Sequence, residues 1–290
     1  MKKTYRVAGH KFAIVMPDNS PNWDNMDNYA PFFVDDADDC LFVAEQVEAL
    51  PDTHDKTLVR RMCGDPTQPR FDMYEWNGCW LIEVAPICDA PVCFVMLVEK
   101  DFSYVRIQVI DRWNFAFNTM MKLMFSFATA QLFTIQLHAS VTMKDGKGYL
   151  FLGKSGTGKS THSQLWINNL EGCSLLNDDN PVIRIGSDGV ARVYGSPWSG
   201  KTPCYRNLDV PVGAIVRLRQ AKQNKIRRLS AAEAYASLYT AFTGMKFVKE
   251  MADAYYATNS LLVTTVPNYE LECLPDADAA FLCYKTVSQQ

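Results

Sequence analysis

Short apolar runs separated by turn residues fill the amino-terminal part of the chain. The runs are rich in β-branched and aromatic side chains, which is typical of strands. Asn77-Gly78 stands between two of them and predicts a type I′ hairpin. The pattern therefore predicts a β-rich region over residues 1–108. Its candidate strands are 11–16, 40–47, 71–76, 79–84, 92–98 and 104–110.

The pattern changes over residues 114–131, where apolar side chains occupy almost every face of a segment of helical length. A segment that is apolar all round is typical of a buried helix. A ligand groove is the alternative for such a stripe, and core packing is the commoner role. We interpret the helix as the joint to a second region, residues 109–290. Its apolar members are Phe115, Phe117, Met120, Met121, Leu123, Met124, Phe125 and Phe127.

Strands and helices alternate in this second region, which predicts an α/β (α+β) fold. The segment 133–141 predicts one strand, joined by a tight turn to another at 149–152. Ser230 and Glu233 form the signature of a capping box and predict a helix from there to about residue 245. The remaining candidates are a helix over 161–170, strands over 190–194, 212–219, 225–229 and 269–274, and a closing helix that begins near Pro275.

Residues 153–160 match G-x-x-x-x-G-K-[ST] at every fixed position, directly after a predicted strand. In such a loop the backbone N–H groups and the start of the following helix face a phosphate group. We expect Lys159 to reach the β and γ phosphates and Ser160 to offer its hydroxyl to Mg²⁺. An ordinary Gly-Ser turn is the alternative. The nucleotide-binding residues predicted here are Gly153, Lys154, Ser155, Gly156, Thr157, Gly158, Lys159, Ser160 and Thr161.

Two adjacent aspartates, Asp178 and Asp179, close a short apolar strand after the loop helix. One carboxylate can hold Mg²⁺, directly or through water, while the other accepts the proton of an attacking hydroxyl. Adjacent side chains on an extended strand point to opposite sides, so both reach one site only if the strand ends or bends there. A simple turn is the alternative for these residues taken alone.

Further candidates come from isolated residues. His138 lies near the end of a predicted strand, where its ring either packs or approaches the phosphates. The loop 195–202 is rich in glycine and proline and could cover the nucleotide or receive a substrate. Four cations are candidates for phosphate contact, although each alone is more commonly a surface charge: Lys201, Arg206, Arg217 and Arg219.

The composition and charge of the chain limit the classes of partner that we expect. The chain has 290 residues, 48% of them hydrophobic, and a net charge of −3, so neither a nucleic acid nor a membrane surface is an expected partner. No apolar run reaches the roughly 18 residues that a membrane helix needs, and we expect a cytoplasmic protein. The nine cysteines form no C-x-x-C pair, so reduced thiols are expected in place of a disulfide framework or a zinc site.

Three segments together resemble the catalytic domain of HPr kinase/phosphorylase: 137–140 (Leu-His-Ala-Ser), 151–160 and 176–179 (Leu-Asn-Asp-Asp). The resemblance covers roughly residues 131–290. It implies the fold shared with phosphoenolpyruvate carboxykinase, a mixed sheet around a phosphate loop, with ATP as the nucleotide. Carried over by position, it makes Asp178 the catalytic base and places Asp179 with Ser160 at the metal. It also assigns His138 to the same pocket and Lys159 to the phosphates.

The stretch 191–198 departs from that family, because the acidic residue expected there is absent. We therefore predict a related kinase, dependent on ATP and Mg²⁺, that phosphorylates a serine or another hydroxyl of a protein, peptide or small molecule. Carboxykinase-like chemistry is less favoured, since no histidine and lysine set for a second metal is evident. The alternative of another class is a nucleotide-binding regulatory module that transfers nothing. The phosphoacceptor and the oligomeric state are left open.

Overall fold

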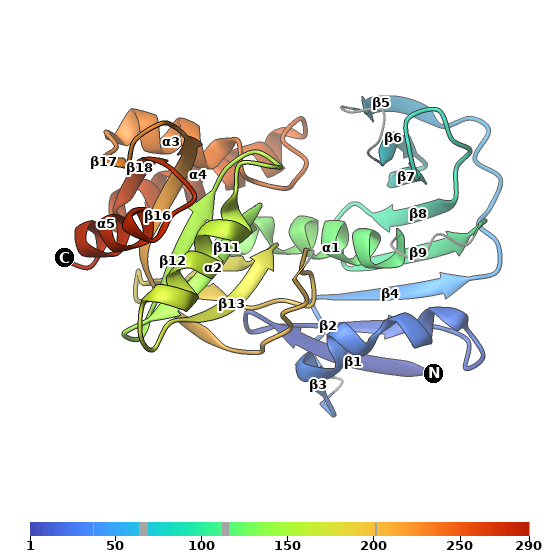
Figure 1. The fold of residues 1–290 in the computed structure, drawn as a ribbon. Helices are drawn as coiled ribbons and strands as arrows, with labels where there is room; N and C mark the ends of the chain where they lie inside the picture. Colours follow the sequence, from blue (N-terminus) through green and yellow to red (C-terminus); the bar gives the residue numbers. More distant parts are fainter. Residues whose placement is uncertain (37, 64–68, 112–115, 201, 290) are drawn as a thin grey trace. The chain divides into compact units, whose positions relative to one another are not determined.

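The computed structural model describes residues 1–36, 38–63, 69–111, 116–200 and 202–289. The chain divides into two compact units, Met1–Ala128 and Thr129–Gln290. The expected boundary after residue 108 lies before the helix α1 (Ala116–Thr129), whereas the two units divide near the end of that helix. The fold is mixed α/β, with two large mixed sheets and few helices among the described residues (Figure 1).

The first unit is built on one sheet with the strand order β3-β1-β2-β4-β9-β8-β7-β6-β5. β4 pairs parallel with β2 and β9, and the remaining pairs of this sheet are antiparallel. The bounds are β1 Lys2–Val7, β2 His10–Val15, β3 Phe33–Val34, β4 Phe42–Val47, β5 Thr57–Met62, β6 Arg70–Trp76, β7 Cys79–Ala85, β8 Phe94–Glu99 and β9 Tyr104–Val109. Two 3-10 helices, Pro21–Asn25 and Asp27–Phe32, precede β3.

Two local predictions in this unit are confirmed. Asn77 and Gly78 form the turn between β6 and β7, and both have positive φ, as a type I′ hairpin requires. α1 is a buried helix: Met120, Met124 and Phe125 have no exposed surface. Its Phe125 ring lies 5.9 Å from the Phe12 ring of β2, so the helix covers the sheet of its own unit. The predicted helix residues 114 and 115 lie outside the described residues.

The expectation of reduced cysteines is wrong for one pair. Cys63 and Cys88 form a disulfide. Cys63 follows β5 and Cys88 follows β7, and the sheet brings their Cα atoms to 5.7 Å, a separation that a disulfide spans without strain. The two cysteines are 25 residues apart in the sequence. Their contact depends on how the strands pair, so it could not be predicted from the sequence.

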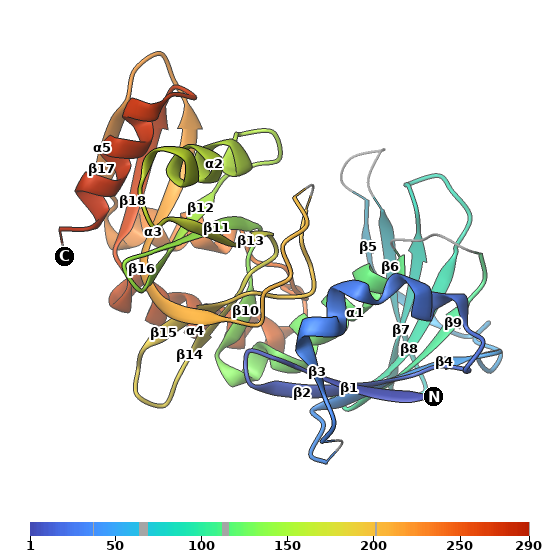
Figure 2. The ribbon, with the colours of Figure 1, turned by 60° about the horizontal axis from the view of Figure 1, so that its bottom comes forward.

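The second unit has the strand order β10-β14-β15-β16-β12-β11-β13, and β18 adds to β16 and pairs with β17 (Figure 2). The strands are β10 Thr134–Gln136, β11 Ala139–Lys144, β12 Lys147–Leu152, β13 Ser174–Asp179, β14 Val182–Ile185, β15 Ala191–Tyr194, β16 Asp209–Gln220, β17 Lys225–Arg228 and β18 Asn268–Cys273. The helices are α2 Lys159–Asn169, α3 Ala231–Tyr239, α4 Lys249–Thr265 and α5 Ala277–Val287, with a 3-10 helix at Ala130–Leu132.

Strand direction places several strand ends at one edge of this sheet. β11 is antiparallel to both β12 and β13, so these two run the same way. β16 is parallel to β12, and β18 is parallel to β16. The carboxyl ends of β12, β13, β16 and β18 therefore meet at one edge, together with the start of β11.

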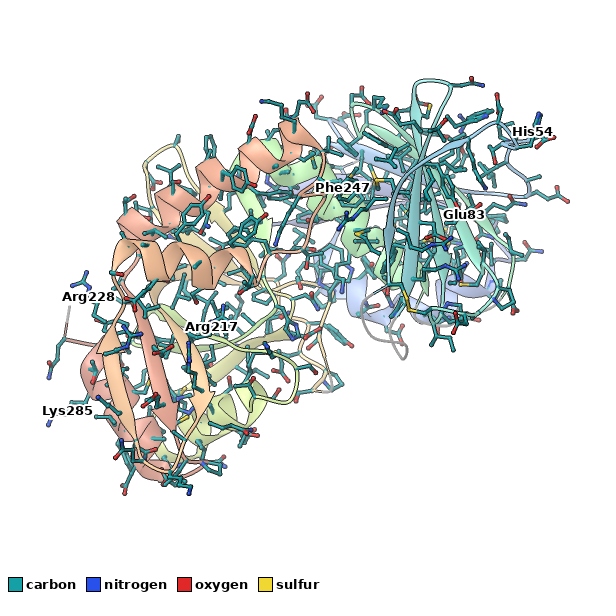
Figure 3. The ribbon with its side chains drawn as sticks, turned by 90° about the horizontal axis from the view of Figure 1, so that it is seen from above. His54, Glu83, Arg217, Arg228, Phe247 and Lys285 are labelled. Carbon is teal, nitrogen blue, oxygen red and sulfur yellow. A yellow bond between two sulfur atoms is a disulfide. The ribbon has the colours of Figure 1, made fainter. Side chains whose placement is uncertain are left out.

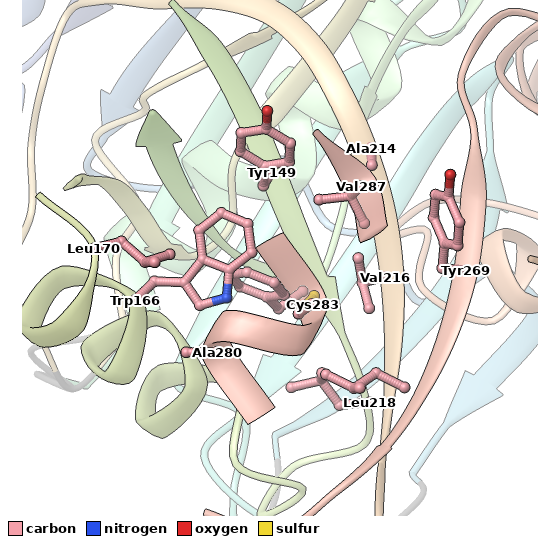
Figure 4. Packing of buried hydrophobic residues seen from close by; sticks show 12 residues of the cluster. Tyr149, Trp166, Leu170, Ala214, Val216, Leu218, Tyr269, Ala280, Cys283 and Val287 are labelled. Atoms are coloured by element: carbon pink, nitrogen blue, oxygen red, sulfur yellow. The ribbon is translucent and has the colours of Figure 1, made fainter. Parts of the chain in front are cut away.

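A compact apolar core lies under α2 and α5 on one face of the sheet (Figure 4). Trp166 of α2 is fully buried, and its ring lies 5.2 Å from Phe151 of β12 and 5.5 Å from Tyr284 of α5. Leu218 of β16 belongs to the same core. Because side chains alternate along a strand, Arg217 and Arg219 point to the opposite face. α3 lies on that face, since Arg217 contacts its Ser237.

Two predicted elements differ from the structure, and one set of contacts explains both. The expected strand 133–141 is split into β10 and β11, with His138 in the break. The helix that opens at Ser230 ends at Tyr239 and not near residue 245. The segment after it pairs with the break: His138 donates its N–H to the Ala241 carbonyl at 2.9 Å, and Leu137 bridges Phe242. Pairing between these two backbone segments therefore ends the helix at Tyr239 and interrupts the strand at His138.

None of the helices in the described ranges is long and apolar enough to cross a membrane.

Candidate phosphate site

The glycine loop lies between β12 and α2, and its backbone has the strain that only glycine tolerates. Gly158 has φ +105° directly before α2. A Cβ on Gly153 would lie 2.9 Å from the Thr157 Cβ, so this position also requires glycine. Gln220, at the end of β16, donates to the Gly156 carbonyl at 3.2 Å. The loop is therefore held at both sides, at the start of a helix, where free backbone N–H groups can receive an anion.

Lys159 extends back along this loop. Its Nζ donates to the Gly153 carbonyl at 3.1 Å and the Lys154 carbonyl at 3.4 Å, and lies 2.9 Å from the His138 Nε2. Only 9% of the residue is exposed. Burial lowers the pKa of Lys159, while the charges of Asp179 and Asp178 act in the opposite direction. A buried ammonium held by neutral acceptors would gain from an anion placed in the loop.

His138 joins Lys159 to Asp179. An ammonium group has only donors, so the His138 Nε2 accepts from Lys159 and the proton of the neutral ring lies on Nδ1. Nδ1 is 2.8 Å from the Asp179 Oδ1, and its N–H donates to that carboxylate. The break between β10 and β11 therefore has a chemical consequence, because it lets the His138 ring bridge the loop lysine and a carboxylate.

Asp178 contacts Ser160, the residue that follows Lys159. The Ser160 hydroxyl donates to its Oδ1 at 2.9 Å. Asp178 is 3% exposed, and its Oδ2 is buried without a hydrogen-bond partner among the described residues. A buried carboxylate oxygen of this kind is costly unless a cation or donor reaches it.

These oxygens fit a magnesium ion. Two ligands at adjacent corners of an octahedron, each about 2.1 Å from Mg²⁺, lie about 3 Å apart. The Ser160 and Asp178 oxygens have that separation, and the orphaned Oδ2 faces the same need for a cation. No cluster of three or more His, Cys, Asp or Glu side chains suited to a metal occurs in the part of the chain that the structure describes. Mg²⁺ is commonly held by one or two protein ligands with the rest supplied by water and phosphate.

The backbone at Asp179 explains how two adjacent aspartates reach one site. Asp179 has φ +131°, a conformation that is strained for a residue with a side chain. Its backbone bridges Ser199, whose hydroxyl donates to the Asp178 carbonyl at 3.1 Å. The strand ends here against the loop 195–200, so Asp178 can contact Ser160 while Asp179 contacts His138.

A cavity of about 810 Å³ opens beside the loop on the α3 face. Of the four cations expected at phosphates, Arg217 and Arg219 line it. Arg206 does not, because it donates to the Leu175 carbonyl at 2.6 Å on another part of the unit. Lys201 lies outside the described residues. The cavity's other charged residues, Arg227, Glu233 and Glu270, could not be predicted from the sequence, because they come from β17, α3 and β18 and share no motif.

A second cavity of about 410 Å³ adjoins the first and shares Gly156, Thr157, Leu218 and Gln220 with it. Its wall is formed by Thr161 and Leu165 of α2, Leu218 of β16, and Leu274 with Pro275 after β18. His162 also lines it and is neutral near pH 7, because burial lowers its pKa to about 4. No other titratable side chain than His162 and Cys273 reaches this cavity in the described chain, so it suits an uncharged, flat group.

No protein-family model matches the chain, and no curated protein matches its sequence. Among solved structures, the HPr(Ser) kinase/phosphatase from Coxiella burnetii is similar with a TM-score of 0.31 and 13% sequence identity. The match covers 53% of this chain and 93% of that one. At this TM-score the likeness carries no argument about function, so function has to be inferred from the geometry of the site.

Proposed function

We propose that the chain is an ATP- and Mg²⁺-dependent kinase that transfers the γ-phosphate to a serine or another hydroxyl. The observation that carries the proposal is the chain of contacts from Lys159 through His138 to Asp179. It orients a carboxylate toward the group that binds phosphate. Nucleotide binding alone has no need of such a carboxylate, whereas a kinase needs a base beside the transferred phosphoryl group.

The contacts favour a division of roles that reverses the one expected from the resemblance. We assign Asp178 to Mg²⁺, because it already shares a hydrogen bond with Ser160 and has an unused buried oxygen. We assign Asp179 as the base, because the His138 ring holds it and it is more exposed than Asp178. His138 acts as a positioning residue for Asp179.

The chemistry follows from these positions. Lys159 turns from the carbonyls of its own loop to the phosphate oxygens and neutralises part of their charge. Mg²⁺, when bound with ATP, supplies further charge neutralisation at the β and γ phosphates. The acceptor hydroxyl gives its proton to the Asp179 carboxylate as its oxygen attacks the γ phosphorus. The bond from phosphorus to the bridging oxygen breaks, and ADP leaves with that electron pair.

The test combines binding and transfer on the full chain. Calorimetry with ATP and Mg²⁺ measures affinity, and transfer of labelled γ-phosphate to a cell extract measures activity. We expect Asp179→Asn to keep ATP affinity within about twofold and to lose transfer by at least about 100-fold. Asp178→Asn should instead lose the Mg²⁺ dependence of ATP binding. Asp253→Asn, on the exposed surface of α4, is the matched control. A parallel titration with GTP in place of ATP tests which nucleobase the site prefers.

The alternative is a nucleotide-binding regulatory module. One observation favours it: β15 carries Arg192, paired with Asp209, in the stretch where an acidic residue was expected. Tight Mg²⁺-dependent ATP binding with no transfer by the wild type would support the module. Absence of nucleotide binding would contradict both proposals.

A further inference from the structure

The cavity on the α3 face has an excess of positive charge. Its lining has four cationic side chains and two carboxylates: Lys154, Arg217, Arg219, Arg227, Glu233 and Glu270. The two carboxylates are already paired. Glu270 contacts Arg219 at 2.5 Å and Arg227 at 2.8 Å, and Glu233 contacts Arg227 at 2.9 Å. Arg217 makes no ion pair with any residue that the structure describes.

Arg217 is instead held by neutral groups at the end of α3. Its Nε donates to the Ser237 hydroxyl at 2.9 Å, and its Nη2 donates to the Thr240 hydroxyl at 3.1 Å and to the Ser237 carbonyl. Nη1 makes no hydrogen bond within the described part of the chain. Burial lowers the pKa of Arg217, and the charge of Arg219 adds to this effect, while the charge of Glu270 acts in the opposite direction. The guanidinium is thus fixed in direction, partly desolvated, and left with two N–H donors.

Arg217 lines the larger cavity, together with residues 153–157 of the loop. The second cavity, whose wall includes Leu165, Leu274 and Pro275, suits a nucleotide base and not an anion, and Arg217 does not line it. In the proposed kinase the nucleotide phosphates occupy the loop, beside Lys159 and the start of α2. The acceptor hydroxyl has to reach the γ phosphorus there, and the cavity of about 810 Å³ that the loop shares with Arg217 has room for a second substrate next to the terminal phosphate.

We infer that Arg217 binds an oxyanion of the phosphoacceptor, so that the substrate is a hydroxyl compound that carries a phosphate or a carboxylate. The two unused N–H groups, both on Nη1, can donate to an oxygen of either oxyanion, and the charge of the guanidinium strengthens such hydrogen bonds. The assignment of this oxyanion to the phosphoacceptor rests on the proposed kinase function. The presence of an anion site in the cavity can be tested without that function.

The test uses inorganic phosphate as the probe and the full chain saturated with Mg²⁺ and a non-hydrolysable ATP analogue. Calorimetry should detect phosphate binding that Arg217→Gln weakens by at least about tenfold, as loss of a charged hydrogen-bonding partner implies. Arg228→Gln is the matched control. It removes the same charge from β17, where Arg228 projects away from the unit while Arg217 lies against the sheet (Figure 3). This control should change phosphate affinity by less than about twofold.

Further arms identify the ligand and guard against misfolding. Arg217→Lys keeps the charge but loses the hydrogen bonds to Ser237 and Thr240 that hold Nη1 in place, and should weaken phosphate binding while leaving the circular dichroism spectrum unchanged. Glycerol 3-phosphate and citrate, titrated as competitors, distinguish a phosphate-bearing from a carboxylate-bearing acceptor. Affinity for the ATP analogue should stay within about twofold in all three arginine variants.

Two results would overturn the inference. One is absence of phosphate binding to the nucleotide-loaded wild type. The other is a loss of affinity for the ATP analogue in Arg217→Gln with phosphate binding unchanged, which would assign Arg217 to the nucleotide. Failure of the proposed function is a separate outcome: if the wild type binds no nucleotide but binds phosphate in an Arg217-dependent way, the anion site stands and the kinase proposal falls.

Discussion

His162 should make the second unit lose stability in mild acid. Its ring lies in the first turns of α2, 4.7 Å from the Phe151 ring, and its Nε2 accepts a hydrogen bond from the Trp166 Nε1 at 3.1 Å. The residue is 2% exposed. Burial lowers its pKa from 6.5 to about 4, because a protonated ring in this apolar contact would lose its hydration. The folded unit therefore keeps His162 neutral.

The sign and size of the effect follow from proton linkage. The unfolded chain binds the proton near pH 6.5 and the folded chain only near pH 4. Well above pH 6.5 His162 is neutral in both states, so its titration costs no stability. As the pH drops below 6.5, protonation of the unfolded chain lowers the free energy of unfolding, by about 2 kcal/mol at pH 5 and about 3 kcal/mol below pH 4.

The assay compares urea unfolding at pH 8 and pH 5 for the wild type and His162→Gln. Glutamine keeps an acceptor for Trp166 but does not titrate, so the variant should lose about 2 kcal/mol less than the wild type between the two pH values. His54→Gln is the control, because His54 is 81% exposed and lies in the other unit. The same dependence in wild type and His162→Gln, or an NMR titration of the His162 ring near pH 6.5, would refute the reasoning.

Three further predictions concern stability. Gly158→Ala should lower the free energy of unfolding by about 1–2 kcal/mol in urea, because φ is +105° and no atom lies within 4 Å of the added Cβ, so the cost is backbone strain alone; an unchanged midpoint would contradict this. Trp166→Ala should cost about 3–5 kcal/mol by the cavity it leaves, and Trp166→Phe clearly less, which thermal unfolding can compare. Cys63→Ser should cost about 3 kcal/mol under non-reducing conditions through the lost closure of the loop to Cys88, and an equal loss on adding a reductant to the wild type is the check; alkylation of both cysteines in the unreduced wild-type protein would count against the bond.

Local features of the fold could be predicted from neighbouring residues. The Asn77-Gly78 turn is where the sequence placed it, and Ser230 and Glu233 form the reciprocal hydrogen bonds of a capping box. Each depends on residues within a few positions of one another, so tertiary contacts had little to change. The loop 153–160 is likewise a strand–loop–helix junction, as its glycines and the flanking patterns predicted.

Where a helix or strand ends was less predictable. Neither the break at His138 nor the end of α3 at Tyr239 could be predicted from neighbouring residues, because both come from pairing between segments about a hundred residues apart. The roles of Asp178 and Asp179 depend on the same kind of contact. Their identity and spacing predicted a site, but the strained backbone at Asp179 decides which carboxylate faces Ser160 and which faces His138.

The sequence by itself therefore determined the strand, glycine loop and helix over residues 149–169, and it predicted that two carboxylates lie beside them. Only the tertiary structure decided which face of the sheet carries Arg217 and which carries Leu218, and how α3, β17 and β18 enclose a charged cavity around that arginine. The physical reason is that a motif sets local backbone geometry through adjacent residues, whereas a cavity is formed by side chains whose directions depend on the register of strands far apart in the chain.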